Sequence, residues 1–100
     1  YDTAFESCDL VCTPTTPTPA FALGEKTGNP LEMYLADIFT LPPSLAGVAA
    51  ISTPSGLSSS GLPIGLQLVA PPFEEERLCT IAQAVENACG LTDKHPARLD

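Results

Sequence analysis

The sequence predicts an α/β fold in which helices cover a β-sheet. Residues 5–13 and 62–70 form two short apolar runs bounded by prolines or by Gly/Ser turns, as is typical of strands. Apolar residues recur at helical spacing in two other stretches, residues 31–39 and 78–89. A shorter strand is expected at residues 50–53. With 100 residues, the chain suits one small domain or part of a larger one.

The first predicted strand, residues 5–13, carries Cys8, Leu10 and Cys12 at alternate positions, with another apolar residue between the last two. This pattern indicates a short, largely buried strand. The strand is expected to end where three prolines fall within residues 13–19, because proline lacks a backbone N–H and fixes its φ angle. That stretch is a stiff loop, and it acts either as a connector or as a rigid wall beside a pocket.

A helix is predicted to begin after Asn29. This residue suits the N-cap, Pro30 suits the first helical position, and Glu32 lies three residues after the cap. Pro42 and Pro43 are expected to end the helix, since proline disrupts a helix interior. Apolar residues at helical spacing form one face that is expected to pack inward: Leu31, Tyr34, Leu35, Ile38 and Phe39.

Asp37 lies beside this apolar face, in the last turn of the predicted helix. The negative end of the helix dipole disfavours a carboxylate at that position. Asp37 is therefore either a solvated surface residue, as most such residues are, or a functional residue whose charge is compensated locally. Its position alone leaves both interpretations open.

The second half of the sequence predicts a strand at residues 50–53 that ends at Pro54, a turn at residues 55–61, and a strand at residues 62–70. In the last strand Gln67 is the one polar side chain among apolar neighbours. Near-continuous apolarity is typical of a strand that is covered on both faces. Two helices can hardly cover both faces of a sheet, so we expect further protein upstream to complete the cover.

The last predicted helix begins in the acidic residues 74–76, whose charges suit a helix N-terminus, and ends before Gly90. Residues 91–100 form a polar tail that is expected to be loosely held. We therefore expect residues 1–90 to form one unit, the C-terminal part of a domain, and residues 91–100 to lie outside it.

The charge balance argues against direct binding of a nucleic-acid backbone. Four basic residues against twelve acidic ones give a net charge of −8. The basic residues are scattered, whereas phosphate binding requires clustered Lys and Arg. The sequence also contains no apolar run long enough to span a bilayer and no targeting signal.

The four cysteines predict neither a disulfide framework nor a metal site. Cys8, Cys12, Cys79 and Cys89 lack the dense spacing of small secreted proteins and the paired spacing of zinc ligands. His95 is the one histidine and adds nothing to a metal site. We expect plain buried or half-buried thiols in a reducing compartment.

Several segments resemble the amidase-signature family in order and spacing: residues 9–17, 33–40, 45–47, 50–54 and 61–68. The last segment, with Gly-Leu-Pro followed by Gly-Leu-Gln, is similar to a block shared by many amidases. Residues 20–26 and 33–40 resemble more specifically the A subunits of aspartyl/glutamyl-tRNA amidotransferases. The resemblance covers residues 2–88. It implies the C-terminal fragment of the amidase-signature fold, with a mixed β-sheet covered by helices.

By this resemblance, the parent enzyme hydrolyses glutamine and passes the ammonia to a misacylated tRNA. Its nucleophilic serine, bridging serine and lysine base lie in a region upstream of this sequence, so the resemblance implies no catalytic residue here. Residues 58–60 are three serines, but they fall where the family has a variable loop. Asp37 matches an aspartate that contributes to the glutamine pocket, where a carboxylate can pair with the substrate's α-ammonium.

The resemblance also implies partners and cofactors outside this chain. The parent acts with amidotransferase B and C subunits and meets tRNA only through that complex. ATP and Mg would be used in a partner subunit, while no cofactor or metal is expected in this chain. The resemblance implies a cytoplasmic protein in a bacterium, and a mitochondrial or chloroplast protein in a eukaryote.

Two other functions fit the same residues. The chain could belong to another amidase of the family that acts on a small amide, and an upstream arginine for the α-carboxylate of glutamine would argue against that alternative. It could also belong to a truncated, non-catalytic paralogue that acts as a binding module. An upstream reading frame that encodes the lysine and the two serines would exclude the paralogue.

Overall fold

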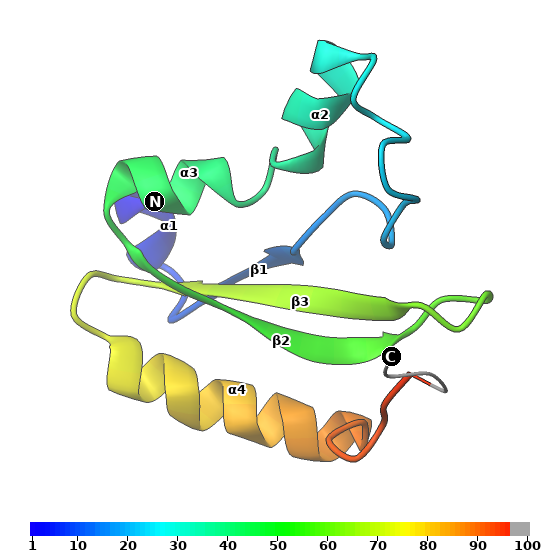
Figure 1. Ribbon diagram of the computed structural model, residues 1–100. Coiled ribbons are helices and arrows are strands. Elements are labelled where there is room, and N and C mark those ends of the chain that lie inside the picture. The colour runs from blue at the N-terminus through cyan, green and yellow to red at the C-terminus, as the bar shows by residue number, and fades with distance from the viewer. Residues whose placement is uncertain (97–100) are drawn as a thin grey trace.

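The computed structural model describes residues 1–96 of the chain and shows a three-stranded sheet with helices on either side (Figure 1). In chain order the elements are α1 (Asp2–Phe5), β1 (Val11–Pro14), α2 (Pro30–Ala36), α3 (Leu41–Ala46), β2 (Ala49–Leu57), β3 (Pro63–Ala70) and α4 (Glu75–Cys89). The strand order is β1-β3-β2, and each neighbouring pair is antiparallel. The predicted α/β fold is confirmed.

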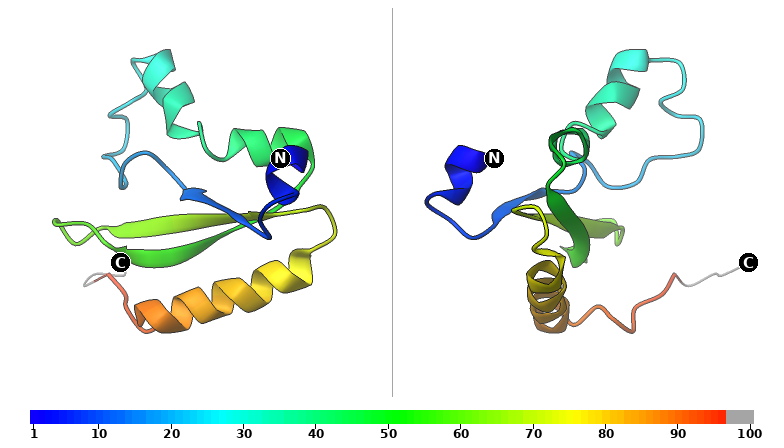
Figure 2. Two further views of the ribbon diagram at one scale, coloured as in Figure 1. Left: turned by 180° about the vertical axis from the view of Figure 1, so that it is seen from behind. Right: turned by 90° about the vertical axis from the view of Figure 1, so that its left-hand side faces the viewer.

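Helix α4 covers one face of the sheet, and α2 and α3 lie on the opposite side (Figures 1 and 2). We call the face that α4 covers the helix side and the opposite face the loop side. Because side chains alternate along a strand, Leu66, Leu68 and Ala70 of β3 face the helix side, while Gly65 and Gln67 face the loop side. The two sides are held by different kinds of contact.

The helix side contains the apolar core. Its buried residues are Ala49, Leu68, Ala70, Leu78 and Ala82. The sequence predicted α4 correctly: Glu75 and Glu76 occupy its first turn, where carboxylates suit the helix dipole, and Gly90 ends it with a φ of 66°. This left-handed backbone conformation is favourable for glycine and unfavourable for most other residues.

Strand β3 is the central strand and is buried over its second half, residues 67–70. The predicted cover on both faces is confirmed for this half, since Leu68 and Val69 point to opposite sides and are both buried. It does not extend to the first residues of the strand, because Pro63 and Ile64 are exposed. The register places Gln67 opposite Thr13 on one neighbour and opposite Ser52 on the other. A polar row therefore crosses the loop side of the sheet.

The prediction of one strand over residues 5–13 was wrong. Residues 2–5 form α1, and β1 is shorter and starts later, at Val11. The alternation of apolar residues before Val11 belongs to a helix and a turn, in which the N–H of Cys8 donates to the carbonyl of Ala4 at 3.2 Å. A short run of apolar residues is compatible with a strand or a helix, and here the chain forms the local hydrogen bonds of a helix and turn instead of pairing as a strand.

The prediction that Pro42 and Pro43 end a helix was also wrong. Helix α2 ends at Ala36, and both prolines lie in the first turn of α3. The first N–H groups of a helix have no partner within it, so prolines at those positions forfeit no hydrogen bond. The carbonyl of Pro43 accepts from the N–H of Gly47, where α3 ends in a left-handed glycine with a φ of 72°.

The second strand continues beyond Pro54, which the sequence had predicted as its end. Strand β2 reaches Leu57 through an irregularity in register between Pro54 and Gly56. Proline is tolerated at such a place because β2 pairs only with β3 in the described sheet and its other edge needs no donor. The predicted turn is correspondingly shorter, and the N–H of Gly61 donates to the carbonyl of Ser58 at 2.9 Å.

The apolar face of α2 does not pack inward among the residues that the structure describes. Leu31 and Tyr34 are 64% and 62% exposed, and α2 stands away from the sheet (Figure 1). The N-terminal signals were correct, since the Asn29 side chain accepts from the N–H groups of Leu31 and Glu32 at 3.1 and 3.3 Å. Hydropathy thus predicted the helix but not its packing.

The polar tail begins after α4, and residues 92–96 are exposed. The remainder of the predicted tail, including Arg98, lies outside the described residues. Among the helices of residues 1–96, none is long and apolar enough to cross a membrane.

Candidate functional site

Asp37 lies at the connection between α2 and α3, where it caps the C-terminus of α2. Its backbone carbonyl accepts from the N–H groups of Thr40 and Leu41 at 3.1 and 3.0 Å, and from the Thr40 hydroxyl at 3.3 Å. These bonds close a tight turn that links the two helices. The Asp37 side chain is exposed, and its charge is therefore available to a ligand.

Gln67 anchors this connection to the sheet. Its Nε2 donates to the carbonyl oxygen of Phe39 at 2.8 Å and to Oγ1 of Thr13 at 3.0 Å. Gln67 is 5% exposed, and both bonds are partly buried. Sequence reasoning missed Gln67 as a functional residue, although its position as the one polar residue in an apolar strand was a usable signal.

A second polar contact anchors the stiff Thr/Pro loop, residues 13–19, on the same side of the sheet. The N–H of Thr15 donates to the carbonyl of Gly65 at 3.1 Å, and the hydroxyls of Thr15 and Ser52 lie 2.6 Å apart. A Cβ on Gly65 would lie 2.8 Å from the Thr15 hydroxyl oxygen and 2.9 Å from that of Ser52. Glycine is thus required for the loop to approach the strand so closely.

The Thr/Pro loop lines two hollows on this side, as the wall interpretation expected. One, of about 180 Å³, lies between Pro14 and Pro19 of the loop and Ile64 of β3. The other, of about 250 Å³, lies between the loop and α2 and is lined by Pro17, Thr18, Lys26, Glu32, Leu35 and Ala36. Ala36 directly precedes Asp37 in the chain, but Asp37 itself does not line the second hollow.

Two other hollows of the structure lie away from the residues singled out for the site. One, of about 360 Å³, lies beside the start of α4 and includes Phe73 and Arg77. The other, of about 270 Å³, lies between the β2–β3 turn and residues 94–96. The size of a hollow therefore does not identify the candidate site. The site is defined by the polar groups at the α2–α3 connection, namely the Asp37 carboxylate and the Gln67 carboxamide.

The serines of residues 58–60 are engaged within their own turn. The hydroxyls of Ser58 and Ser60 lie 3.0 Å apart, and Ser58 Oγ accepts from the N–H of Leu62 at 3.1 Å. Of the two lysines of the chain, Lys26 places its Nζ 4.6 Å from the centre of the Phe21 ring, and Lys94 lies in the exposed tail. These contacts stabilise local structure and assemble no nucleophile–base pair.

The four cysteines are free thiols, but the expectation that all are buried or half-buried was wrong. Cys8, Cys12 and Cys79 are exposed, and only Cys89 is partly buried. In residues 1–96 no group of three or more His, Cys, Asp or Glu side chains is close enough to hold a metal ion.

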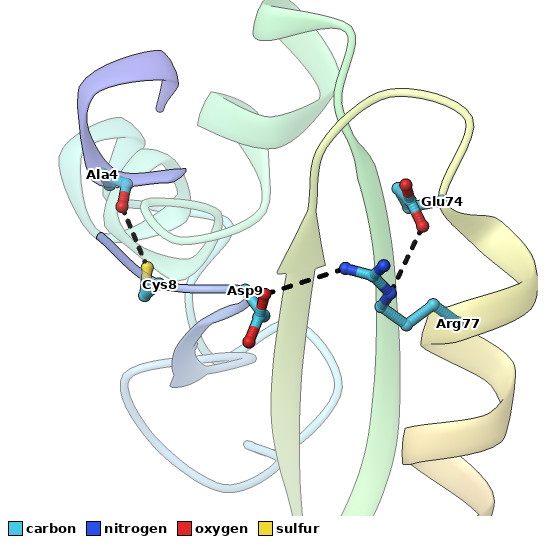
Figure 3. A network of polar contacts seen from close by, with 5 residues as sticks. All are labelled: Ala4, Cys8, Asp9, Glu74 and Arg77. Carbon is cyan, nitrogen blue, oxygen red and sulfur yellow. Dashed lines mark hydrogen bonds and ion pairs between the residues drawn. The ribbon is translucent and has the colours of Figure 1, made fainter. Parts of the chain in front are cut away.

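The cluster in Figure 3 includes one of these thiols, Cys8, whose Sγ donates to the carbonyl of Ala4 at 3.1 Å. Beside it, Arg77 of α4 lies 3.9 Å from a carboxylate oxygen of Asp9 and 3.4 Å from one of Glu74 (Figure 3). The Asp9–Arg77 pair joins the segment before β1 to the start of α4. Because Arg77 and Asp9 are well exposed, we interpret this cluster as surface structure.

The family model for amidases matches residues 1–79 of the chain. The chain belongs to the amidase family. This assignment confirms the resemblance found in the sequence. The Gly-Leu-Gln part of the shared block lies in the central strand β3, and the Gly-Leu-Pro part leads into it.

Curated relatives of this amidase chain are A subunits of glutamyl-tRNA(Gln) amidotransferase. The relative from Geotalea daltonii is 56% identical over 95 residues, which are 95% of this chain and 19% of the relative. The relative from Geobacter metallireducens is 58% identical over 85 residues, which are 85% of this chain and 18% of the relative. The chain thus spans about a fifth of the length of these curated relatives.

Two solved structures share the fold. The A subunit of glutamyl-tRNA(Gln) amidotransferase from Thermotoga maritima matches with a TM-score of 0.81 and 41% identity, over 88% of this chain and 19% of that one. A 6-aminohexanoate cyclic dimer hydrolase in complex with its substrate matches with a TM-score of 0.84 and 31% identity, over 96% of this chain and 23% of that one. The chain therefore has the fold of part of an amidase-signature enzyme.

Proposed function

We propose that this chain serves as the C-terminal part of a glutamyl-tRNA(Gln) amidotransferase A subunit, and that Asp37 binds the α-ammonium group of glutamine. The observation that carries the proposal is the 56% identity over 95 residues to such a protein. The position of Asp37 supports its role, because its exposed carboxylate is held on an anchored turn that directly follows α2, whose last residue, Ala36, lines a hollow.

In the proposed reaction the complete enzyme subunit hydrolyses glutamine, and the ammonia is used to amidate a misacylated tRNA. The serine nucleophile, the bridging serine and the lysine base are contributed by a region outside this sequence. The residues of this chain bind and orient the substrate. A carboxylate and an ammonium form a charge-assisted hydrogen bond, which is stronger than one between neutral groups and depends on correct placement of both partners.

The proposal includes the other components of an amidotransferase complex. The B and C subunits would complete the amidotransferase, and ATP and Mg would be bound in a partner subunit. The net charge of −8 is consistent with tRNA contacting other parts of the complex. We propose a cytoplasmic location in a bacterium, and the mitochondrion or chloroplast in a eukaryote.

A second candidate function is hydrolysis of another small amide. It is favoured by the structural match to the 6-aminohexanoate cyclic dimer hydrolase, which covers 96% of the chain at 31% identity. We prefer the amidotransferase because the identity to its curated A subunits is higher over nearly the same share of the chain, 95%. Substrate preference of the complete protein, glutamine against a cyclic amide, would separate the two.

The first prediction tests Asp37 directly. Asp37→Asn in the complete protein, within its assembled complex, is expected to raise the KM for glutamine about tenfold to a hundredfold, because the charge of the hydrogen bond is lost. Steady-state ammonia release from glutamine measures the effect. Asp93→Asn removes an equally exposed carboxylate from the tail and is the matched control. A KM that stays the same in Asp37→Asn would reduce Asp37 to a structural role.

A further inference from the structure

The side chain of Gln67 donates one hydrogen bond within the sheet and one to a segment outside it. The register places it between Thr13 and Ser52, two polar residues on neighbouring strands. A carboxamide buried in a sheet must find partners, since an unpaired buried polar group is costly. Thr13 alone supplies a partner within the sheet, at 3.0 Å. The shorter bond, of 2.8 Å, leaves the sheet and reaches the carbonyl of Phe39.

This bond reaches a segment that packing holds only weakly. Within the described residues, none of α2 is buried, and in α3 only Pro43 is. The position of the α2–α3 connection over the sheet must therefore be fixed by specific contacts. Gln67 provides one of them from the centre of the sheet, with both of its N–H donors committed to oxygen acceptors.

The Phe39 carbonyl is coupled to Asp37 through a short stretch of ordered backbone. Asp37 precedes Phe39 by two residues, and the N–H groups of Thr40 and Leu41 both donate to the Asp37 carbonyl. The turn thus encloses Phe39, so fixing the Phe39 carbonyl also fixes where the Asp37 backbone lies. A displacement of one end of such a turn moves the other.

We propose that Gln67 is a positioning residue for substrate binding: its buried carboxamide holds the α2–α3 connection so that the Asp37 carboxylate meets the α-ammonium of the substrate. The proposal rests on the role of Asp37 given above as the proposed function. It assigns to β3 a part in substrate selection, without direct contact between Gln67 and the substrate.

The experiment compares two amides in the complete protein within its complex. Glutamine carries an α-ammonium, whereas glutaramate, the monoamide of glutaric acid, has the same amide and carboxylate without it. The ratio of kcat/KM for the two amides therefore reports the contribution of the α-ammonium. Asp37→Asn gives the reference value for a site that has lost this contribution.

Two variants of Gln67 remove its donors while keeping its length. Gln67→Glu offers only acceptors when ionised, and Gln67→Met offers no donor. Both are expected to lower the preference for glutamine about tenfold or more, as small misplacements in a site can. The kcat/KM for glutaramate should change no more than about twofold, because the α-ammonium contact is the one affected.

Two control variants test whether any change on this side of the sheet has the same effect. Thr13→Ser removes the methyl group of Thr13 and keeps the hydroxyl that accepts from Gln67, so both bonds of Gln67 remain. Ser52→Ala removes the hydroxyl contact to Thr15, in the same cross-strand row as Gln67. Both controls should retain the preference for glutamine. If the larger changes prevent folding, Gln67→Asn keeps a carboxamide that is too short to reach Phe39 and should still lose the preference.

The outcomes separate the two proposals. Loss of the glutamine preference in Asp37→Asn and in the Gln67 variants supports both. If Asp37→Asn loses the preference and the Gln67 variants retain it, the positioning role is wrong and the proposed function stands. An equal loss of activity toward both amides in the Gln67 variants also overturns the positioning role, because it indicates general disruption. If Asp37→Asn keeps the preference, the role of Asp37 itself fails.

Discussion

The two sides of the sheet are stabilised by different physical means. On the helix side, α4 packs its apolar face on β2 and β3, and the buried groups are mainly apolar side chains such as Leu68 and Leu78. The buried hydroxyl of Thr53 adds one hydrogen bond, to the carbonyl of Ala82 at 3.5 Å. On the loop side, two polar side chains of the sheet hold two chain segments: Gln67 donates to the carbonyl of Phe39, and the hydroxyl of Ser52 lies 2.6 Å from that of Thr15 in the loop. The apolar residues of α2, by contrast, remain exposed.

This difference suits a division of labour between stability and substrate binding. Burial of apolar area is non-directional and scales with the area removed from water, so it stabilises a fold without fixing a geometry sharply. Hydrogen bonds contribute less net free energy, but they depend on distance and angle. A site that must place one carboxylate against one ammonium gains from the second kind of contact, and Asp37 lies on that side.

The largest expected effect tests the helix side. Leu78→Ala, at a residue that is 2% exposed, should lower the free energy of unfolding by about 2–5 kcal/mol, because it removes buried methyl groups and leaves a cavity. Chemical denaturation of the chain measures the change from the shift in midpoint at constant slope.

Leu31→Ala is the matched control on the loop side, since the same truncation there removes an exposed side chain. Its effect should stay within about 0.5 kcal/mol. Equal losses at the two leucines would contradict the comparison, because they would show that α2 is as tightly packed in solution as α4.

The parts of the fold that sequence predicted well are those with local signals. Acidic residues at the start of α4 and Gly90 at its end mark both ends of that helix. Asn29 likewise marks the start of α2, because the capping bonds join neighbours in the chain. Apolar side chains of α4 meet the sheet through the face that their spacing predicted.

The parts that sequence predicted wrongly depend on context. Pro42 was predicted to end a helix, but a proline is equally compatible with the start of one. The turn closed by hydrogen bonds to the Asp37 carbonyl separates α2 from α3 and so places Pro42 at a helix start. Pro54 looked like a strand end, but it lies in a strand whose outer edge is free in the described sheet. The apolar face of α2 predicted burial, but none of the described residues buries it.

The candidate site was only partly predictable from the sequence. Asp37 was singled out by resemblance, with support from its unfavourable place near a helix end. Gln67 was visible as a polar residue in an apolar strand, but its partner Phe39 is distant in sequence, and the accepting group is a backbone carbonyl that carries no sequence signal. Long-range hydrogen bonds to the backbone are thus hidden from single-sequence reasoning.

A smaller effect is expected where the Thr/Pro loop approaches β3. Gly65→Ala should destabilise the chain by about 1–3 kcal/mol, since the new Cβ would lie 2.8 Å from the Thr15 hydroxyl oxygen and force the loop away. Denaturation curves of the variant measure this loss. Gly28→Ala is the control, because no atom lies within 4 Å of a Cβ placed there.

A double variant would show whether Thr15 is the cause of that loss. Thr15→Ala removes the nearest hydroxyl, so Gly65→Ala should cost less in its presence, and a double-mutant cycle measures the coupling. If the two losses simply add, the close approach of loop and strand is not what requires glycine at residue 65.

The smallest effect is expected for the two ion pairs of Arg77, of which the one with Asp9 joins the segment before β1 to α4 (Figure 3). Arg77→Gln removes the charge that lies 3.9 Å from Asp9 and 3.4 Å from Glu74. Exposed pairs of this kind contribute about 0–1 kcal/mol, and salt screens them, so the loss should be small and should shrink further at high salt. Denaturation at low and high ionic strength, with Asp9→Asn as the partner variant, measures both. A loss as large as that of Leu78→Ala would mean that charge, and not apolar burial, holds α4 against the sheet, and the contrast between the two sides would have to be abandoned.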